Sequence, residues 1–268
     1  VTYPAAGNIG GGGFMNIRMA DGRSAAIDYR EVAPIAATHD MYVEYGKLTE
    51  KSKLGHLASG VPGPVAGLAE ALRKYGSMPL AKVMAPAIRL AEEGFIVDSA
   101  FSRSLGGETS GVARFEGKSV FFPGGIVVQP GVRLLQKDLA RTLRLIAAQG
   151  PKAFYEGAVA DSLVAEEQRG GGIITKEDLR RYTPQWRTPI RSTFRGYTLF
   201  TMPPASSGGI TMTETLNILE NFAPLPPNGS VQYLHLLAEA YRRAFTDRNT
   251  RLGDPAFVKV PLDMLTSK

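Results

Sequence analysis

The chain's most informative stretch is FMNIRMADGRSAAIDYREVAP, residues 14–34. Two apolar runs flank the turn signal Asp21-Gly22, a pattern that predicts a β-hairpin. Arg30 directly follows the second run and stands shortly before Pro34, which ends extended structure. An arginine offers five donors in a planar fork that matches a carboxylate at two points. The stretch therefore predicts a strand that leads into an anchoring cation.

Four glycines, Gly10 to Gly13, precede this hairpin. A phosphate-binding loop needs the order strand, glycines, helix, with a lysine at a fixed place, so this order argues against one. Glycines at such density instead let the backbone pass close to another strand or to a ligand. We therefore expect a close backbone approach beside the hairpin.

In the rest of the chain, the spacing of apolar residues predicts helices between two strand regions. Helices are expected at residues 64–75, 80–93, 97–105, 134–149, 151–169, 175–182, 210–221 and 230–251. Hairpins are expected from residues 14–19 with 24–29 and from residues 188–194 with 197–202. Strands at both ends with many helices between them predict an α+β layered fold, counted as a single domain over residues 1–268.

Several boundaries carry specific expectations. Thr175 to Asp178 form the pattern of a capping box, and Pro86 is expected to kink or divide its helix. Residues 106–111 are expected to be a loop, and residues 115–128 irregular or short-strand surface. The inner face expected for the last helix is Leu234, Leu237, Ala238, Tyr241 and Phe245.

Composition narrows the class of protein. Hydrophobic residues make up 44% of the 268 residues and charged residues 21%, ordinary values that exclude a disordered chain. No apolar stretch approaches the roughly 20 residues that span a bilayer. With no cysteine there is no disulfide framework, thiol nucleophile or thiolate metal site. The net charge is +6, but the cations are scattered, which favours a mildly basic surface over a nucleic-acid site.

A series of segments resembles the large-subunit region of the γ-glutamyltransferases, members of the N-terminal-nucleophile hydrolase superfamily. The similar segments follow the family order over essentially the whole chain. They are residues 7–15, 28–34, 57–63, 74–80, 91–95, 171–179, 202–209 and 252–255.

The resemblance implies a fold and an activity. The fold would be part of a four-layer αββα sandwich. The enzyme would transfer the γ-glutamyl group of glutathione or related amides to water, amino acids or peptides, through an ester on the N-terminal threonine of a small subunit made by self-cleavage. It implies no metal or organic cofactor and a periplasmic or secreted location.

By the same resemblance, Arg30 would bind the α-carboxylate of the substrate. Spacing alone leaves a structural alternative open, a salt bridge from Arg30 to Glu31, Asp28 or a remote acid. No catalytic residue is expected in this chain, which begins at Val1 and would be an internal fragment of the large subunit. We expect it to be inert without the small subunit.

Other candidate residues have simpler interpretations. Thr38-His39 is the only threonine followed by histidine, but capping of a helical turn from about residue 41 by Thr38 or Asp40 is favoured. Ser206 and Ser207 could place hydroxyls in a cleft, although N-capping is preferred. His39, His56 and His235 are expected to be surface or packed residues and not metal ligands. Asp247, Arg248 and Arg251 are expected to form a solvated ion-pair face, and Asp254 to organise a turn.

Two rival functions remain open at this point. A related acylase acting on glutaryl or cephalosporin-type side chains would share the scaffold and would also need an acid-anchoring group. A divergent homologue without catalytic activity would bind γ-glutamyl compounds or only pack against a partner.

Overall fold

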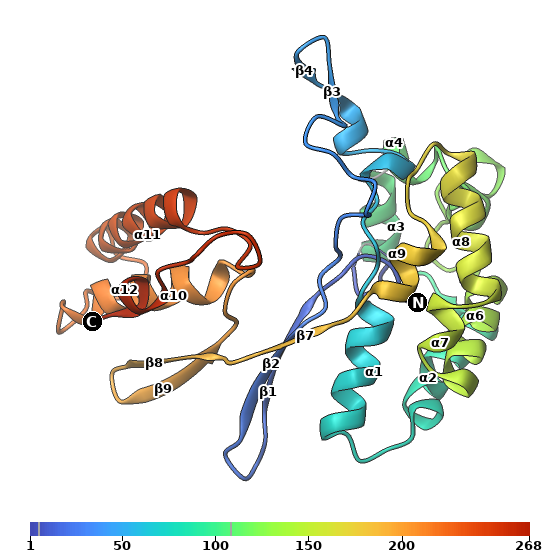
Figure 1. The fold of residues 1–268 in the computed structure, drawn as a ribbon. Helices are drawn as coiled ribbons and strands as arrows, with labels where there is room; N and C mark the ends of the chain where they lie inside the picture. The colour runs from blue at the N-terminus through green and yellow to red at the C-terminus, as the bar shows by residue number, and fades with distance from the viewer. Residues whose placement is uncertain (5, 108) are drawn as a thin grey trace. The chain divides into compact units, whose positions relative to one another are not determined.

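The computed structural model describes residues 1–4, 6–107 and 109–268. Both of its compact units contain helices and short strands (Figure 1), which confirms the expected α+β class. Unit 1 comprises Val1–Gly12 and Tyr29–Pro184, and unit 2 comprises Gly13–Asp28 and Gln185–Lys268. The chain therefore enters unit 1 for the second time one residue before Arg30.

Helices form most of unit 1 and enclose its main apolar core. They are α1 (Pro64–Tyr75), α2 (Leu80–Glu92), α6 (Lys137–Gln149), α7 (Lys152–Tyr155), α8 (Ala158–Arg169) and α9 (Lys176–Arg181). Val61, Phe154 and Leu179 belong to this core, and full burial of such a side chain contributes about 1.5–3 kcal/mol. α2 packs against α6 through Ala91 and Leu143.

Local sequence signals set the ends of these helices. α1 begins with Pro64, whose missing N–H has no partner to lose at a first helical position. Gly94 follows α2 with φ +77°, a left-handed conformation that glycine adopts without strain. α9 begins with the expected capping box, in which Thr175 and Asp178 bond each other's backbone N–H.

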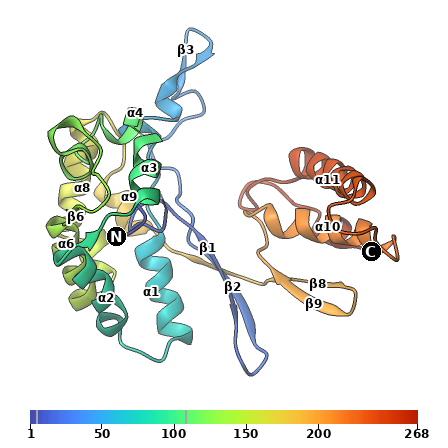
Figure 2. The same cartoon turned by 180° about the vertical axis from the view of Figure 1, so that it is seen from behind.

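A second apolar cluster of unit 1 lies between α2 and α6 in the sequence. It takes residues from α3 (Ser99–Gly107), α5 (Lys118–Phe121), and the strand pair β5 (Phe95–Ile96) with β6 (Arg133–Leu134). α4 (Thr109–Val112) follows α3. Phe101 and Leu134 are buried in this cluster. A small hairpin, β3 (Val43–Glu44) with β4 (Lys47–Leu48), projects from the rest of unit 1 in both views (Figures 1 and 2).

Unit 2 contains both sequence-predicted hairpins. β1 (Phe14–Arg18), β2 (Ser24–Asp28) and β7 (Gln185–Arg187) form an antiparallel sheet in the order β1-β2-β7. β8 (Ile190–Phe194) pairs with β9 (Tyr197–Thr201). Arg195 and Gly196 both have positive φ, the geometry that suits a two-residue hairpin turn.

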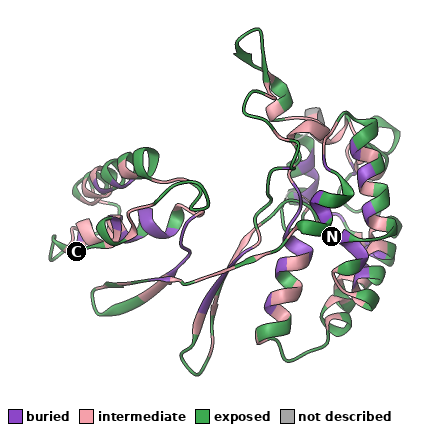
Figure 3. Cartoon of the chain, in the orientation of Figure 1, coloured by how far each residue is buried: buried purple, intermediate pink, exposed green. Residues whose placement is uncertain are grey.

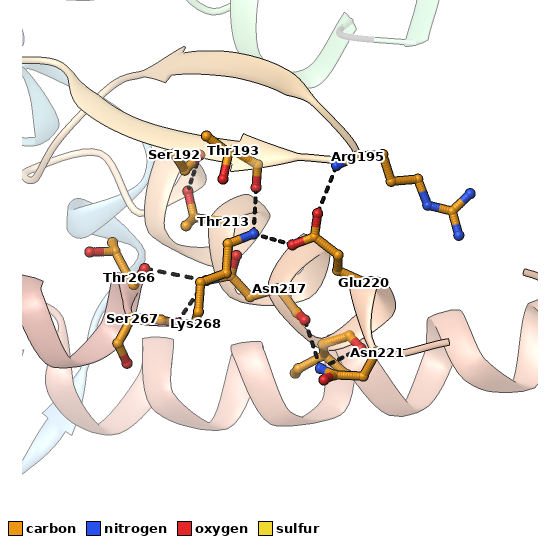
Figure 4. A network of polar contacts seen from close by, with 11 residues as sticks. Ser192, Thr193, Arg195, Thr213, Asn217, Glu220, Asn221, Thr266, Ser267 and Lys268 are labelled. Carbon is orange, nitrogen blue, oxygen red and sulfur yellow. Dashed lines mark hydrogen bonds and ion pairs between the residues drawn. The ribbon is translucent and has the colours of Figure 1, made fainter. Parts of the chain in front are cut away.

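Three helices complete unit 2: α10 (Gly208–Glu220), α11 (Val231–Arg251) and α12 (Leu262–Thr266). Polar contacts hold the end of α10 to its neighbours (Figure 4). Glu220 accepts the N–H of Arg195 at 2.7 Å and also contacts Lys268. Asn217 donates to the carbonyl oxygens of Thr266 and Ser267.

Several element predictions are wrong in detail, for identifiable reasons. The helix expected over residues 151–169 is two helices, because Gly157 at φ +129° interrupts it. Pro86 does not divide its helix, because α2 runs unbroken from Leu80 to Glu92. Residues 106–107 and 109–111 are helical rather than loop, and Glu108 lies outside the described residues.

Three further predictions fail at the level of local packing. The region 115–128, expected to be irregular or short-strand surface, contains no strand: it has short helical turns at Lys118–Phe121 and Pro123–Gly125 within irregular backbone, and it buries Phe122 and Val128. No helix begins near residue 41, where a turn leads into β3. Little of α11 is buried (Figure 3): its buried residues are Ala240 and Ala244, whereas Leu234, Tyr241 and Phe245 of the expected inner face are about half exposed.

None of the helices in the described part of the chain combines the length and the apolarity that crossing a bilayer requires.

Candidate functional site

The segment from Tyr29 to Ile35 is held by hydrogen bonds from distant parts of unit 1. Tyr182 donates its hydroxyl to the Arg30 carbonyl oxygen at 2.9 Å. Val32 and Val61 exchange backbone hydrogen bonds of 2.8 and 3.3 Å. At the far end, the Ile35 N–H donates to Asp178 Oδ1 at 2.7 Å. These contacts fix the backbone on which the Arg30 side chain is mounted.

Close approach of the backbone requires glycine beside this segment. A Cβ placed on Gly12 would overlap the Glu31 nitrogen and the Arg30 Cα, both backbone atoms that cannot move aside. At Gly63 a Cβ would overlap the Tyr29 carbonyl oxygen and the Tyr182 hydroxyl. The close approach expected from the glycine run is thus confirmed at Gly12, and it falls on Arg30 itself.

The Arg30 side chain is 54% exposed, and its Nε lies 3.7 Å from Glu31 Oε1. An exposed ion pair at this distance contributes little to stability. Asp28 Oδ2 pairs with Arg187 at 2.9 Å within unit 2. The salt bridge to Glu31 that was considered from sequence is present at the distance given above.

The electrostatics of the supporting groups follow from their burial and hydrogen bonds. Burial alone would raise the pKa of Asp178, but hydrogen bonds from Thr175 and Ile35 lower it below its usual value. Asp178 is therefore charged at neutral pH and accepts strongly. Burial raises the pKa values of the Tyr29 and Tyr155 hydroxyls, which keeps both protonated, and Tyr155 donates its hydroxyl to the Pro62 carbonyl oxygen at 2.8 Å.

An open groove of about 770 Å³ lies between α1, α7 and the end of α9. Its apolar lining includes Tyr155 and Leu179, and its rim includes Arg73 and Lys152. Tyr155 and Tyr182 stack there with ring centroids 5.8 Å apart. Tyr182 connects the groove wall to the Arg30 carbonyl. The groove therefore lies next to the Arg30 segment, and Arg30 is not among its lining residues.

The structure gives Thr38 and His39 no arrangement suited to nucleophilic catalysis. Both residues are exposed, and His39 Nδ1 lies 2.7 Å from Asp40 Oδ1, the neighbouring carboxylate. The capping role expected for Thr38 or Asp40 is wrong, since no helix starts there. Among the described residues, no group of three histidine, aspartate or glutamate side chains could hold a metal ion.

Ser206 and Ser207 precede α10 in unit 2. The Ser207 side chain does not cap the helix, because its Oγ accepts a hydrogen bond from Arg248 Nε at 3.0 Å. Ser206 Oγ instead accepts the N–H of Gly208 at 3.3 Å. The close packing expected at Gly209 is confirmed, since a Cβ there would overlap the Met202 carbonyl oxygen.

Other expectations outside the candidate site are also met. Arg251 Nε pairs with Asp247 Oδ1 at 2.8 Å on exposed helix surface. Asp254 organises a turn by accepting the N–H of Ala256 on its side chain at 2.9 Å.

Sequence reasoning missed Tyr182 and Asp178 as residues that support the Arg30 segment. The capping box revealed Asp178 as a local residue only, and no sequence signal linked it to Ile35.

Comparisons with known proteins identify the family of this chain. A family model described as gamma-glutamyltranspeptidase matches residues 1–268. The chain is 48% identical over 273 residues to the glutathione hydrolase proenzyme of Escherichia coli strain K12, covering 100% of this chain and 47% of that protein. The chain belongs to the γ-glutamyltranspeptidase family.

Two further relatives define the range of this family. The crystal structure of Helicobacter pylori gamma-glutamyltranspeptidase matches 100% of this chain and 78% of that chain, with a TM-score of 0.96 and 42% identity. It confirms the expected N-terminal-nucleophile hydrolase type of fold. The acylase ACY 1 proenzyme of Pseudomonas sp. strain V22 is 42% identical over 278 residues, 100% of this chain and 50% of that protein. The chain thus spans about half the length of the curated relatives that it matches.

Proposed function

We propose that the whole protein containing this chain transfers γ-glutamyl groups from glutathione or related amides to water, amino acids or peptides. The observation that carries the proposal is the family match over every residue from 1 to 268. A glutathione hydrolase proenzyme at 48% identity supports the choice of substrate class. The attacking group would be the N-terminal threonine of a second, smaller chain, made by cleavage of a common precursor.

We assign to Arg30 the binding of the substrate's α-carboxylate. Its backbone is fixed by Tyr182 and by the approach of Gly12, while its side chain is half exposed and within reach of solvent. A guanidinium mounted on a rigid segment loses little conformational freedom when a carboxylate binds. The weak contact with Glu31 at 3.7 Å would be exchanged for two short charge-assisted hydrogen bonds.

The test of this role replaces the planar guanidinium of Arg30 but keeps its positive charge. In the complete protein, Arg30→Lys should raise KM for a γ-glutamyl anilide roughly ten- to a hundredfold with kcat nearly unchanged, because a charge-assisted bond contributes about 1.5–3 kcal/mol. A 4-aminobutyryl anilide, which lacks the α-carboxylate, should show no such change. Arg181→Lys, an exposed arginine of unit 1, serves as the control. Equal KM values for wild type and Arg30→Lys would remove Arg30 from the site.

An acylase is the second candidate, supported by the 42% identity to the acylase ACY 1 proenzyme. A glutaryl anilide retains the anchoring carboxylate and lacks only the α-amino group. A γ-glutamyl transfer enzyme should therefore prefer the γ-glutamyl anilide, and an acylase should accept the glutaryl anilide equally well or better.

Processing and export are proposed with the activity. Mass spectrometry of the whole gene product should show two chains, the second beginning with threonine; an unprocessed single chain would favour a homologue without catalysis. A location in the periplasm or the medium is proposed from the family resemblance and can be tested by cell fractionation.

A further inference from the structure

A buried carboxyl group lies in the last turn of α8, away from Arg30. Glu167 is only 7% exposed, and its Oε2 has no hydrogen-bond partner within the described part of the chain. Burial raises the pKa of this carboxyl, while the charge of His56 and hydrogen bonding by Ser59 and by the Ile174 N–H oppose the shift. A buried acid is costly to keep, so its position calls for a reason.

His56 packs beside this carboxyl from the other side. Its Nε2 lies 3.0 Å from Glu166 Oε1, and its ring meets Phe115 edge-on at 5.6 Å between centroids. Two of the glycines after α8, Gly170 and Gly172, pack closely against His56 and Glu167. A Cβ on Gly170 would overlap the His56 ring, and one on Gly172 would overlap Glu167 Oε2.

The backbone that begins at His56 leads directly to the Arg30 segment. The short 3-10 helix His56–Ala58 is followed by Ser59, Gly60 and Val61. A Cβ on Gly60 would lie 3.0 Å from the Glu31 Cγ, so this loop packs against the ion-pair partner of Arg30. Val61 then pairs with Val32 through the two backbone hydrogen bonds described above.

We propose that Glu167 and His56 form a positioning cluster for substrate binding, which anchors residues 56–61 and through them the backbone of Glu31 and Arg30. The proposal rests on the proposed role of Arg30. Neither residue touches the substrate in this arrangement. Loss of the carboxyl would leave a void beside Gly172, which lies between Glu167 and His56, and would loosen the packing against which His56 rests. A shift of the loop by a fraction of an ångström would then misplace the guanidinium fork.

The experiment compares two variants of Glu167 in the complete protein. Glu167→Ala should raise KM for the γ-glutamyl anilide about tenfold and change kcat by less than about twofold, the pattern of lost substrate binding. Glu167→Gln keeps the volume and one acceptor oxygen, so its KM should remain near the wild-type value. The matched control is Asp161→Ala, which removes an exposed carboxylate from the same helix.

Two readouts separate positioning from general damage. KM for the 4-aminobutyryl anilide should not change in Glu167→Ala, because Arg30 acts only on the missing carboxylate. Amide hydrogen exchange should accelerate at residues 32 and 59–61 in Glu167→Ala and not in Asp161→Ala. If Glu167→Ala does not fold, His56→Gln removes the ring of the other cluster member instead and should produce a change in the same direction.

The outcomes are distinguishable from those of the proposed function. If Arg30→Lys leaves KM unchanged, the role of Arg30 fails, and hydrogen exchange alone still decides whether Glu167 anchors the loop. If Arg30→Lys raises KM but Glu167→Ala changes neither KM nor exchange, the positioning cluster is refuted. A rise of KM for both anilides in Glu167→Ala would also refute it, because the defect would not involve the carboxylate.

Discussion

Glu214 shows how a single side chain can give unit 2 a pH-dependent stability. Its Oε2 is buried on α10 and has no hydrogen-bond partner among the described residues. Burial and then the charge of Asp247 raise the pKa of Glu214 from 4.5 to about 7, with Arg251 acting in the opposite direction. Between these two values the folded state retains a proton that the unfolded chain has lost.

The sign of the effect follows from this difference in bound protons. The stabilisation is fully present below pH 4.5 and is lost as the pH rises through about 7. Glu214→Gln cannot titrate, so its melting temperature should fall less than that of wild type between about pH 5 and about pH 8. Differential scanning calorimetry of the complete protein measures this difference.

Glu220 on the same helix supplies the control. A hydrogen bond from Lys268 lowers its pKa, so its titration lies below the ordinary glutamate range. Glu220→Gln should therefore leave the slope above about pH 5 unchanged. A wild-type slope in Glu214→Gln would show that this carboxyl is solvated in the complete protein.

At the residue scale, sequence reasoning located the arginine but not its supports. Arg30 could be singled out because strand, cation and proline are adjacent in the chain. Tyr182 and Asp178 support the Arg30 segment from more than 130 residues away in the sequence, and only folding brings them to it. The assignment of Arg30 to the substrate remains a prediction.

At the scale of elements, α9 has two functions in one turn. Asp178 accepts the Thr175 N–H at 2.8 Å, which completes the capping box, and the Ile35 N–H at 2.7 Å, which ties down the end of the Arg30 segment. Its two oxygens therefore serve a helix end and a distant loop at once.

Asp178→Ala should destabilise the protein by about 2 kcal/mol or more, since a lost cap costs about 1 kcal/mol and an unpaired buried N–H about 1–3. Chemical denaturation followed by circular dichroism measures the loss. Glu177→Ala removes an exposed carboxylate from the same turn and should cost less than about 0.5 kcal/mol. Equal losses in the two variants would contradict the double role of Asp178.

Elements with short-range signals were predicted well, and those decided by packing were not. Both hairpins and the capping box depend on neighbouring residues, and all three are present. The helix expected over residues 151–169 was misjudged because its apolar periodicity continues across Gly157, where the backbone turns. The inner face of α11 was misjudged because periodicity identifies an apolar stripe without saying what covers it.

At the scale of the whole molecule, the half-exposed apolar residues of α11 and the family match both bear on the expectation that a second chain completes this one. Leu234, Tyr241 and Phe245 expose apolar surface within a chain that spans about half the length of its curated relatives. Contiguous exposed apolar patches, where they are large, mark interaction sites. The single domain expected over residues 1–268, completed by a second chain, remains a prediction.

Residues 1–268 produced alone should not hydrolyse a γ-glutamyl anilide, because the proposed nucleophile belongs to a second chain. Thr38 is the one threonine in this sequence that directly precedes a histidine. The His39 ring, which would have to accept the proton of the Thr38 hydroxyl, is paired with the Asp40 carboxylate. Thr38→Ala in the complete protein should therefore leave kcat and KM unchanged. Circular dichroism establishes that the isolated chain is folded before its activity is measured. Turnover by the folded isolated chain, abolished by Thr38→Ala, would place the nucleophile in this half of the protein and overturn the proposed division of labour.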